Sequence, residues 1–108
     1  MDKTQWETIG RLVEWLDKES PVTGEQAKTM RVLKIGEEFG EVAEALHGAL
    51  GANPRKGRSH TWTDVEKELT DVIVTAMVAL ATIAPDPQRV FQERLDALAD
   101  RVMPEPQG

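Results

Sequence analysis

Acidic residues at helical spacing are the strongest candidates for chemistry in this sequence. Glu38 and Glu41 are three residues apart in one segment, and Glu68 and Asp71 repeat that spacing in another. Residues three apart on an α-helix project from adjacent turns, so two antiparallel helices could bring the four carboxylates together. Carboxylate oxygens are preferred ligands of Mg²⁺ and Mn²⁺. The spacing therefore predicts a site for one of these ions.

An ordinary solvated helix face would account for any single one of these pairs, but two features favour a metal site. Like charges three and four residues apart repel each other, and Lys34 is the one nearby basic residue in the first segment. Asp71 is followed by Val72 and Ile73, where a buried carboxylate without a partner would be costly. A bound cation would relieve both problems.

Four helices are predicted to position these carboxylates, because apolar residues recur at spacings of three and four along most of the chain. Residues that begin or end helices separate the segments; they are Ser20-Pro21, capping boxes at 23–26 and 63–66, Gly51, and Asp86-Pro87. We expect helices over about 3–18, 24–50, 63–84 and 87–103. With residues about 100° apart around the axis, the second helix carries one apolar stripe, formed by Val32, Ile35, Phe39, Val42, Ala43, Leu46 and Leu50.

The third predicted helix contains an uncharged run from Val72 to Ala84. This run is shorter than the roughly 20 residues that a membrane span needs. A helix that is apolar on nearly all sides must be surrounded by protein, and three partner helices of this size can hardly cover it. We therefore expect an all-α chain whose four-helix core is completed by dimerisation.

Length, charge and composition narrow the function further. The 108 residues fit one domain, which we place at residues 1–103, with a flexible tail at 104–108. A net charge of −6 argues against binding to a nucleic-acid polymer, which needs an excess of basic residues. The lack of cysteine excludes disulfides, thiolate metal sites and cysteine nucleophiles. No signal-peptide pattern opens the chain, so we expect a cytoplasmic protein without a membrane partner.

The acidic motifs resemble those of a known enzyme family. Glu37-Glu38-x-x-Glu41, followed after a long gap by Glu68-x-x-Asp71, is similar to the EExxE…ExxD signature of the MazG-like all-α nucleoside triphosphate pyrophosphohydrolases. The Glu-Val-Ala-Glu-Ala run of the first motif and the Glu-Leu-Thr-Asp-Val-Ile run that opens the apolar helix agree with it. The resemblance covers about residues 30–104.

The resemblance implies a four-helix MazG-like protomer that assembles as a dimer or a dimer of dimers. It implies that Mg²⁺, or Mn²⁺, is held by Glu38, Glu41, Glu68 and Asp71, and that a (d)NTP is cleaved to (d)NMP and pyrophosphate to clean the nucleotide pool. Metal ions would neutralise phosphate charge and orient or activate the attacking water. Glu37 and Glu38 are the candidate catalytic residues; Glu37 would hold a second metal or orient that water, unless it is simply solvated.

Basic residues are the candidates for binding the phosphates, namely Lys34, Arg55, Lys56, Arg58, Arg94 and Arg101. The three in the 51–60 connection form either a lid that closes on phosphates or an ordinary solvated loop. Lys34 either binds phosphate or pairs with Glu38. Arg94 and Arg101 match the basic ends of a pattern that the family often carries near the C-terminus, but Leu98 stands where that pattern has Asn. The nucleotide preference of relatives therefore does not transfer to this chain.

Two other functions are open at this point. A related enzyme would hydrolyse a phosphoribosyl-nucleotide, although the sequence shows no obvious further segment to bind the phosphoribosyl group. A helical interaction module would keep the acidic helices, and with them a cation site, without turnover. The four intact carboxylates argue against the second alternative, because a non-catalytic copy need not keep all of them.

Overall fold

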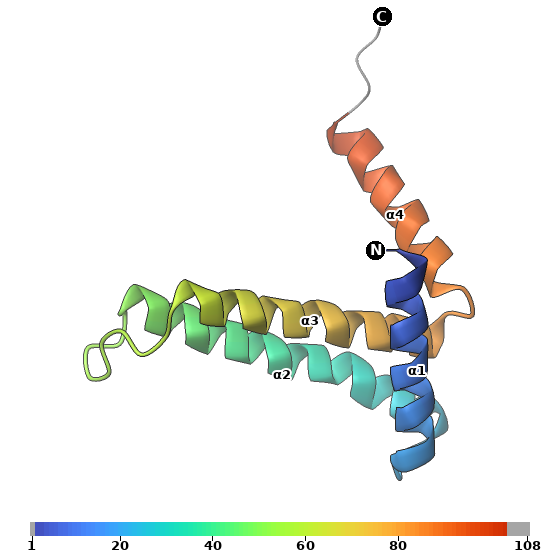
Figure 1. The fold of residues 1–108 in the computed structure, drawn as a ribbon, viewed down its shortest axis with the longest axis horizontal. Coiled ribbons are helices and arrows are strands. Elements are labelled where there is room, and N and C mark those ends of the chain that lie inside the picture. The colour runs from blue at the N-terminus through green and yellow to red at the C-terminus, as the bar shows by residue number, and fades with distance from the viewer. Residues whose placement is uncertain (1, 104–108) are drawn as a thin grey trace, which may run out of the picture.

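The chain folds into four α-helices, as predicted, and the described residues contain no β-strand (Figure 1). This computed structural model describes residues 2–103, so the flexible tail predicted at 104–108 lies outside the described residues. The helices are α1 (Lys3–Glu19), α2 (Gly24–Leu50), α3 (Trp62–Ile83) and α4 (Pro87–Val102). Each boundary lies within one residue of its predicted position, because proline, glycine and capping residues mark the ends.

The helices do not enclose one compact core. α2 and α3 form a long antiparallel hairpin, and α1 crosses it at the end opposite the connection between them (Figure 1). α4 turns away from α3 by 117°. The radius of gyration is 17.4 Å, whereas a compact domain of about 100 residues has one near 13 Å. No single helix in residues 2–103 is long and apolar enough to cross a membrane; α3 and α4 would qualify only as a bent pair.

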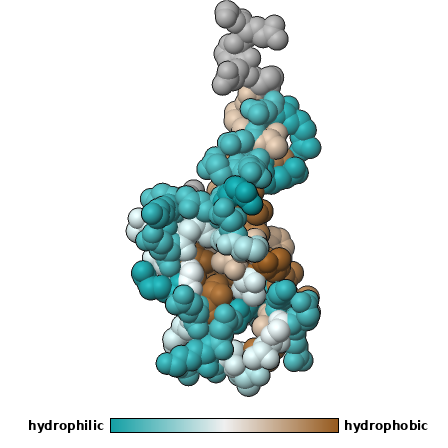
Figure 2. Space-filling view, turned by 90° about the vertical axis from the view of Figure 1, so that its right-hand side faces the viewer, coloured by the Kyte–Doolittle hydropathy of each residue, from teal (hydrophilic) through white to brown (hydrophobic). Residues whose placement is uncertain are grey.

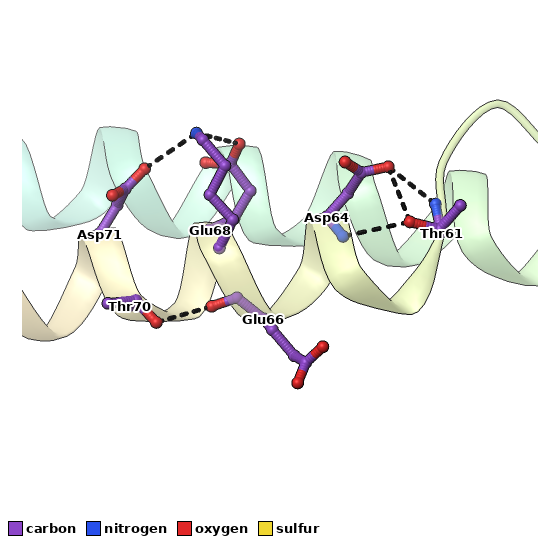
Figure 3. Close-up of polar contacts among 7 residues, drawn as sticks. Thr61, Asp64, Glu66, Glu68, Thr70 and Asp71 are labelled. Atoms are coloured by element: carbon purple, nitrogen blue, oxygen red, sulfur yellow. Dashed lines mark hydrogen bonds and ion pairs between the residues drawn. The ribbon is translucent and has the colours of Figure 1, made fainter.

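The N-terminus of α3 corrects one sequence prediction. The Thr61 hydroxyl accepts a hydrogen bond from the Asp64 amide at 3.3 Å, and the Asp64 carboxylate accepts one from the Thr61 amide at 2.8 Å (Figure 3). This reciprocal pair satisfies two backbone donors at the start of a helix. α3 therefore begins at Trp62, and the capping box predicted at residues 63–66 is wrong.

The capping box predicted at residues 23–26 is also wrong, although α2 begins where expected. Thr23 occupies the N-cap position, but its side chain makes no capping hydrogen bond. Gly24 follows with a φ of +61°, a left-handed conformation that glycine adopts readily. We attribute the missing cap to this turn, because it redirects the backbone between the Thr23 hydroxyl and the amides beyond it.

The capping pair at α3 is expected to make the stability of the chain depend on pH. Hydrogen bonds from the Thr61 amide and then the Thr61 hydroxyl lower the pKa of Asp64 from its ordinary value of 3.8. A lowered pKa in the folded state stabilises the fold above the pKa of the unfolded chain, and that contribution is lost as the pH falls through the folded value. Thermal unfolding should therefore show wild type losing more stability than Asp64→Asn between neutral pH and about pH 3. Parallel losses in the two proteins would contradict this expectation.

α2 and α3 pack together through small side chains near the connection that joins them. Ala45 and Ala49 of α2 form a buried cluster with Val65 of α3, and Gly48 is buried beside them. Small residues allow the two backbones to approach closely. This packing fixes the register of the hairpin and therefore sets which carboxylates of the two helices face each other.

Gly48→Ala is expected to destabilise the chain. A Cβ at this position would overlap the His60 ring and lie 2.6 Å from the Ser59 hydroxyl. The free energy of unfolding should fall by about 1–3 kcal/mol, the usual cost of overpacking, despite the ~1 kcal/mol by which alanine is favoured over glycine in a helix. Urea denaturation measures the change.

Gly40→Ala is the matched control in the same helix, because a Cβ there meets nothing within 4 Å. This variant should be about 1 kcal/mol more stable than wild type, through helix propensity alone. If Gly48→Ala proves as stable as Gly40→Ala, the close contact between α2 and the connection is wrong.

The apolar stripe predicted on α2 does not face α3. Of its seven members only Val42 is buried, whereas Phe39 remains 61% exposed. On α3, Leu69 and Ile73 are 47% and 45% exposed. By their positions around the two helices, several exposed large apolar residues lie on the side away from the acidic residues of the two motifs. We call the following five the apolar face: Val32, Phe39 and Leu50 of α2 and Leu69 and Ile73 of α3.

α1 is held against the hairpin by a small apolar cluster and by one ion pair, in which the arginine is buried and the aspartate is largely exposed. Trp6 is buried with Ile9 and Met77, and its ring centroid lies 6.1 Å from that of Phe91. Arg31 of α2 is buried and donates to the Asp17 carboxylate of α1 at 2.9 Å and to the Thr82 hydroxyl of α3 at 3.1 Å. Apolar side chains still reach the surface on this side (Figure 2).

Candidate metal centre

The antiparallel hairpin brings three of the four predicted metal ligands together. One carboxylate oxygen from each of Glu38, Glu41 and Glu68 lies within 4.8 Å of the other two. Oxygens on opposite sides of a Mg²⁺ ion lie about 4.2 Å apart, twice the usual ligand distance. Small side-chain movements would therefore let the three glutamates, which we call the carboxylate triad, bind one ion.

Two members of the carboxylate triad are largely withdrawn from water. The side chains of Glu38 and Glu68 are only 15% and 18% exposed, whereas Glu41 is exposed. The Oε2 atom of Glu68 is buried without a hydrogen-bond partner among the described residues. A buried carboxylate oxygen without a partner is costly. A divalent cation would supply the missing partner, so the donor set fits Mg²⁺ or Mn²⁺.

The triad also concentrates negative charge. Contact with the Glu68 carboxyl group, followed by the negative charges of Glu38 and Glu68, raises the pKa of Glu41. A bound cation would relieve this mutual repulsion.

The fourth predicted ligand, Asp71, lies outside the triad. Its Oδ2 atom is 3.4 Å from the Nζ atom of Lys67, and the same nitrogen is 3.4 Å from Oε1 of Glu68 (Figure 3). The hydrogen bond to Asp71 and the negative charges of Asp71 and Glu68 raise the pKa of Lys67. Asp71 is thus tied to the triad through a lysine, and its role as a metal ligand stays a prediction.

The candidate catalytic glutamates occupy different surroundings. Lys34 lies 3.5 Å from Oε1 of Glu38 and 3.7 Å from Oε2 of Glu37. Of the two roles considered for Lys34, pairing with Glu38 is the one that the structure shows. Glu37 is exposed and does not belong to the triad. Its predicted role in holding a second metal or orienting water has no geometric support within one chain.

The basic connection between α2 and α3 lies at the end of the hairpin (Figure 1). Its turn is held by Asn53, whose side-chain oxygen accepts hydrogen bonds from the amides of Arg55 at 2.9 Å and Lys56 at 3.2 Å. From Glu41 to the end of α2 at Leu50 the helix rises by about 14 Å. The structure therefore does not bring the three predicted lid residues, Arg55, Lys56 and Arg58, to the triad.

The two basic candidates on α4 are also distant from the triad. Arg94 and Arg101 are exposed, and α4 extends away from the hairpin after packing against α1 and α3 (Figure 1). Within one chain they do not share a site with the carboxylates. Their role in substrate binding stays a prediction.

Sequence reasoning missed Lys67, which is the basic residue that joins Glu68 to Asp71. The signal was present, because Lys67 directly precedes Glu68 and stands four residues before Asp71, a spacing at which opposite charges meet on a helix. The buried Arg31 was missed as well. Its partners lie on two other helices, so its burial cannot be predicted from the residues near it in the sequence.

The triad offers three carboxylate oxygens of the kind that a divalent cation needs, with two lysines beside them. Comparisons with protein-family models, curated proteins and solved structures give no match.

Proposed function

We propose that this chain is a Mg²⁺-dependent nucleoside triphosphate pyrophosphohydrolase of the MazG-like type. It cleaves a (d)NTP to (d)NMP and pyrophosphate, and so removes unwanted nucleotides from the cytoplasmic pool. The observation that carries the proposal is the convergence of Glu38, Glu41 and Glu68 within 4.8 Å, with one buried Glu68 oxygen that has no hydrogen-bond partner among residues 2–103. The EExxE…ExxD pattern supplies the reaction type.

The residues of the chain have distinct roles in this proposal. Glu38 and Glu68 offer partly buried oxygens that hold the ion, and Glu41 adds a third from the exposed side. Asp71 completes the set when it is released from Lys67. Mg²⁺, when bound, would neutralise phosphate charge and orient the attacking water. Lys34 fixes the carboxylate of Glu38 through their ion pair.

The proposed enzyme is a homodimer or a dimer of dimers. Phe39 lies about 160° around α2 from Glu41, and Ile73 lies about 160° around α3 from Asp71. The apolar face is therefore on the side of the hairpin away from the carboxylates, so a second copy could cover it without closing the metal site. Two hairpins packed in this way would complete a four-helix core.

Product analysis tests the proposed function. The purified chain is incubated with Mg²⁺ and each canonical triphosphate, several modified triphosphates and a phosphoribosyl-nucleotide. Release of pyrophosphate and nucleoside monophosphate in equal amounts, abolished by EDTA, is expected for at least one triphosphate. Release of orthophosphate alone, or no release from any nucleotide, would contradict the proposal. Turnover of the phosphoribosyl-nucleotide alone would identify the related enzyme instead.

One observation favours a second candidate, a helical interaction module that binds a cation without turnover. Lys34 and Lys67 already pair with acidic residues of the site, and the other basic candidates lie elsewhere in the chain. The same product analysis separates the two functions, because the module would bind Mg²⁺ and release no pyrophosphate.

A further inference from the structure

Lys67 occupies an unusual position in the candidate site. Its ammonium group lies 3.4 Å from Oε1 of Glu68 and 3.4 Å from Oδ2 of Asp71, and it bridges the two acidic residues of the second motif (Figure 3). Both acidic residues are expected to bind the metal ion. A lysine therefore contacts the groups that the cation would need.

The ion pairs of Lys67 with Glu68 and Asp71 are weak enough to break when a competing cation binds. Its side chain is 68% exposed, and exposed ion pairs contribute little because water and salt screen them. The lysine stem has several rotatable bonds and carries its charge as a compact group with three donors. Lys67 can therefore leave the carboxylates without disturbing the backbone of α3.

Few other cations can contact a polyanion at this site. Among residues 2–103, the basic side chains paired with the acidic residues of the two motifs are Lys34 and Lys67. Lys34 is shared between Glu37 and Glu38 on α2. The predicted phosphate-binding residues of the connection and of α4 lie away from the triad. Lys67 is thus the cation best placed for a phosphate group at the α3 side of the site.

We propose that Lys67 is an exchangeable counter-ion that becomes a phosphate-binding residue. Without a divalent cation it neutralises Glu68 and Asp71; when a divalent cation binds these carboxylates, Lys67 is released and donates hydrogen bonds to a phosphate oxygen of the substrate. This inference rests on the proposed function, because it takes the acidic motifs as the metal site. It assigns the phosphate contact to α3 and not to the basic connection.

The test uses two binding measurements that need no turnover. Calorimetry with Mg²⁺ alone should show Lys67→Gln binding the ion more tightly than wild type, by up to about fivefold, because the competing ammonium is gone. Calorimetry with inorganic pyrophosphate in saturating Mg²⁺ should show the opposite change. The dissociation constant of pyrophosphate should be about tenfold or more higher for Lys67→Gln than for wild type, because a charged hydrogen-bond donor is lost.

Two further variants make the result specific. Lys67→Arg keeps the charge and should bind pyrophosphate within a few fold of wild type. Lys3→Gln removes the same charge from an exposed ion pair with Glu7 at i,i+4 spacing on α1, and both affinities should match those of wild type. Circular dichroism checks that all variants are equally helical.

The outcomes separate this inference from the proposed function. If wild type binds Mg²⁺ and pyrophosphate and Lys67→Gln changes neither affinity, or changes both in the same direction, the role of Lys67 is wrong while the enzyme proposal stands. If both affinities change as expected but no nucleotide is cleaved, the role of Lys67 stands and the enzyme proposal is wrong. A wild-type chain that binds no Mg²⁺ overturns both.

Discussion

Replacing Glu68 with glutamine is expected to abolish metal-dependent turnover while making the chain slightly more stable to heat. Glu68 is the α3 member of the carboxylate triad, and its Oε2 atom is buried with no hydrogen-bond partner in the described part of the chain. Metal-ion catalysis commonly contributes several kcal/mol, so pyrophosphate release should fall by at least about a hundredfold. Removing one charge beside Glu38 and Glu41 relieves like-charge repulsion by some tenths of a kcal/mol.

A substitution that lowers turnover but raises stability, as expected for Glu68→Gln, indicates that the replaced residue binds a ligand and does not stabilise the fold. Initial rates of pyrophosphate release and thermal unfolding without metal measure the two effects. Glu66→Gln is the matched control, because it removes the same charge from an exposed residue two positions earlier whose side chain points away from the triad (Figure 3). Glu68→Gln that keeps wild-type turnover, or that loses activity only through unfolding, would show that the ligand is misassigned.

Phe39→Glu is expected to convert a dimer into a monomer. Phe39 is 61% exposed at the centre of α2 and belongs to the apolar face. Burying a phenylalanine side chain contributes about 1.5–3 kcal/mol, and a buried unpaired carboxylate adds a further cost. The dimer dissociation constant should therefore rise by about a hundredfold or more. Sedimentation velocity over a concentration series measures the change.

Val102→Glu is the control for the interface. Val102 is an exposed apolar residue at the end of α4, outside the apolar face, and its substitution introduces the same charge. We expect this variant to sediment as wild type does. A wild-type chain that is monomeric at micromolar concentration, or a Phe39→Glu variant that remains dimeric, would contradict the proposed interface.

The helices and all three members of the carboxylate triad could be predicted from local patterns. Helix ends depend on neighbouring residues, and α2 ends before Gly51 as predicted; the structure places Gly51 in the left-handed conformation. The i,i+3 spacing of the acidic motifs, together with the antiparallel packing of two consecutive helices, brought Glu38, Glu41 and Glu68 together. These features require only the geometry of a single helix and of one hairpin.

The packing faces could not be predicted in the same way. Hydrophobic periodicity identified a stripe of large apolar residues on α2, but α3 packs against a different side, where Ala45 and Ala49 allow close approach. Periodicity shows that a face is apolar and not which neighbour covers it. The Asp71 side chain can contact either a metal ion or Lys67. The spacing of the residues alone does not determine which of the two contacts forms.

Equilibrium binding of Mg²⁺ to the wild-type chain tests the central claim, that the hairpin builds a metal centre from Glu38, Glu41 and Glu68. Calorimetry is run on wild type and on a Glu41→Gln/Glu68→Gln double variant of equal helical content. We predict saturable binding to wild type and no detectable binding to the double variant. Absence of saturable binding to wild type, or equal binding to both proteins, would contradict the account.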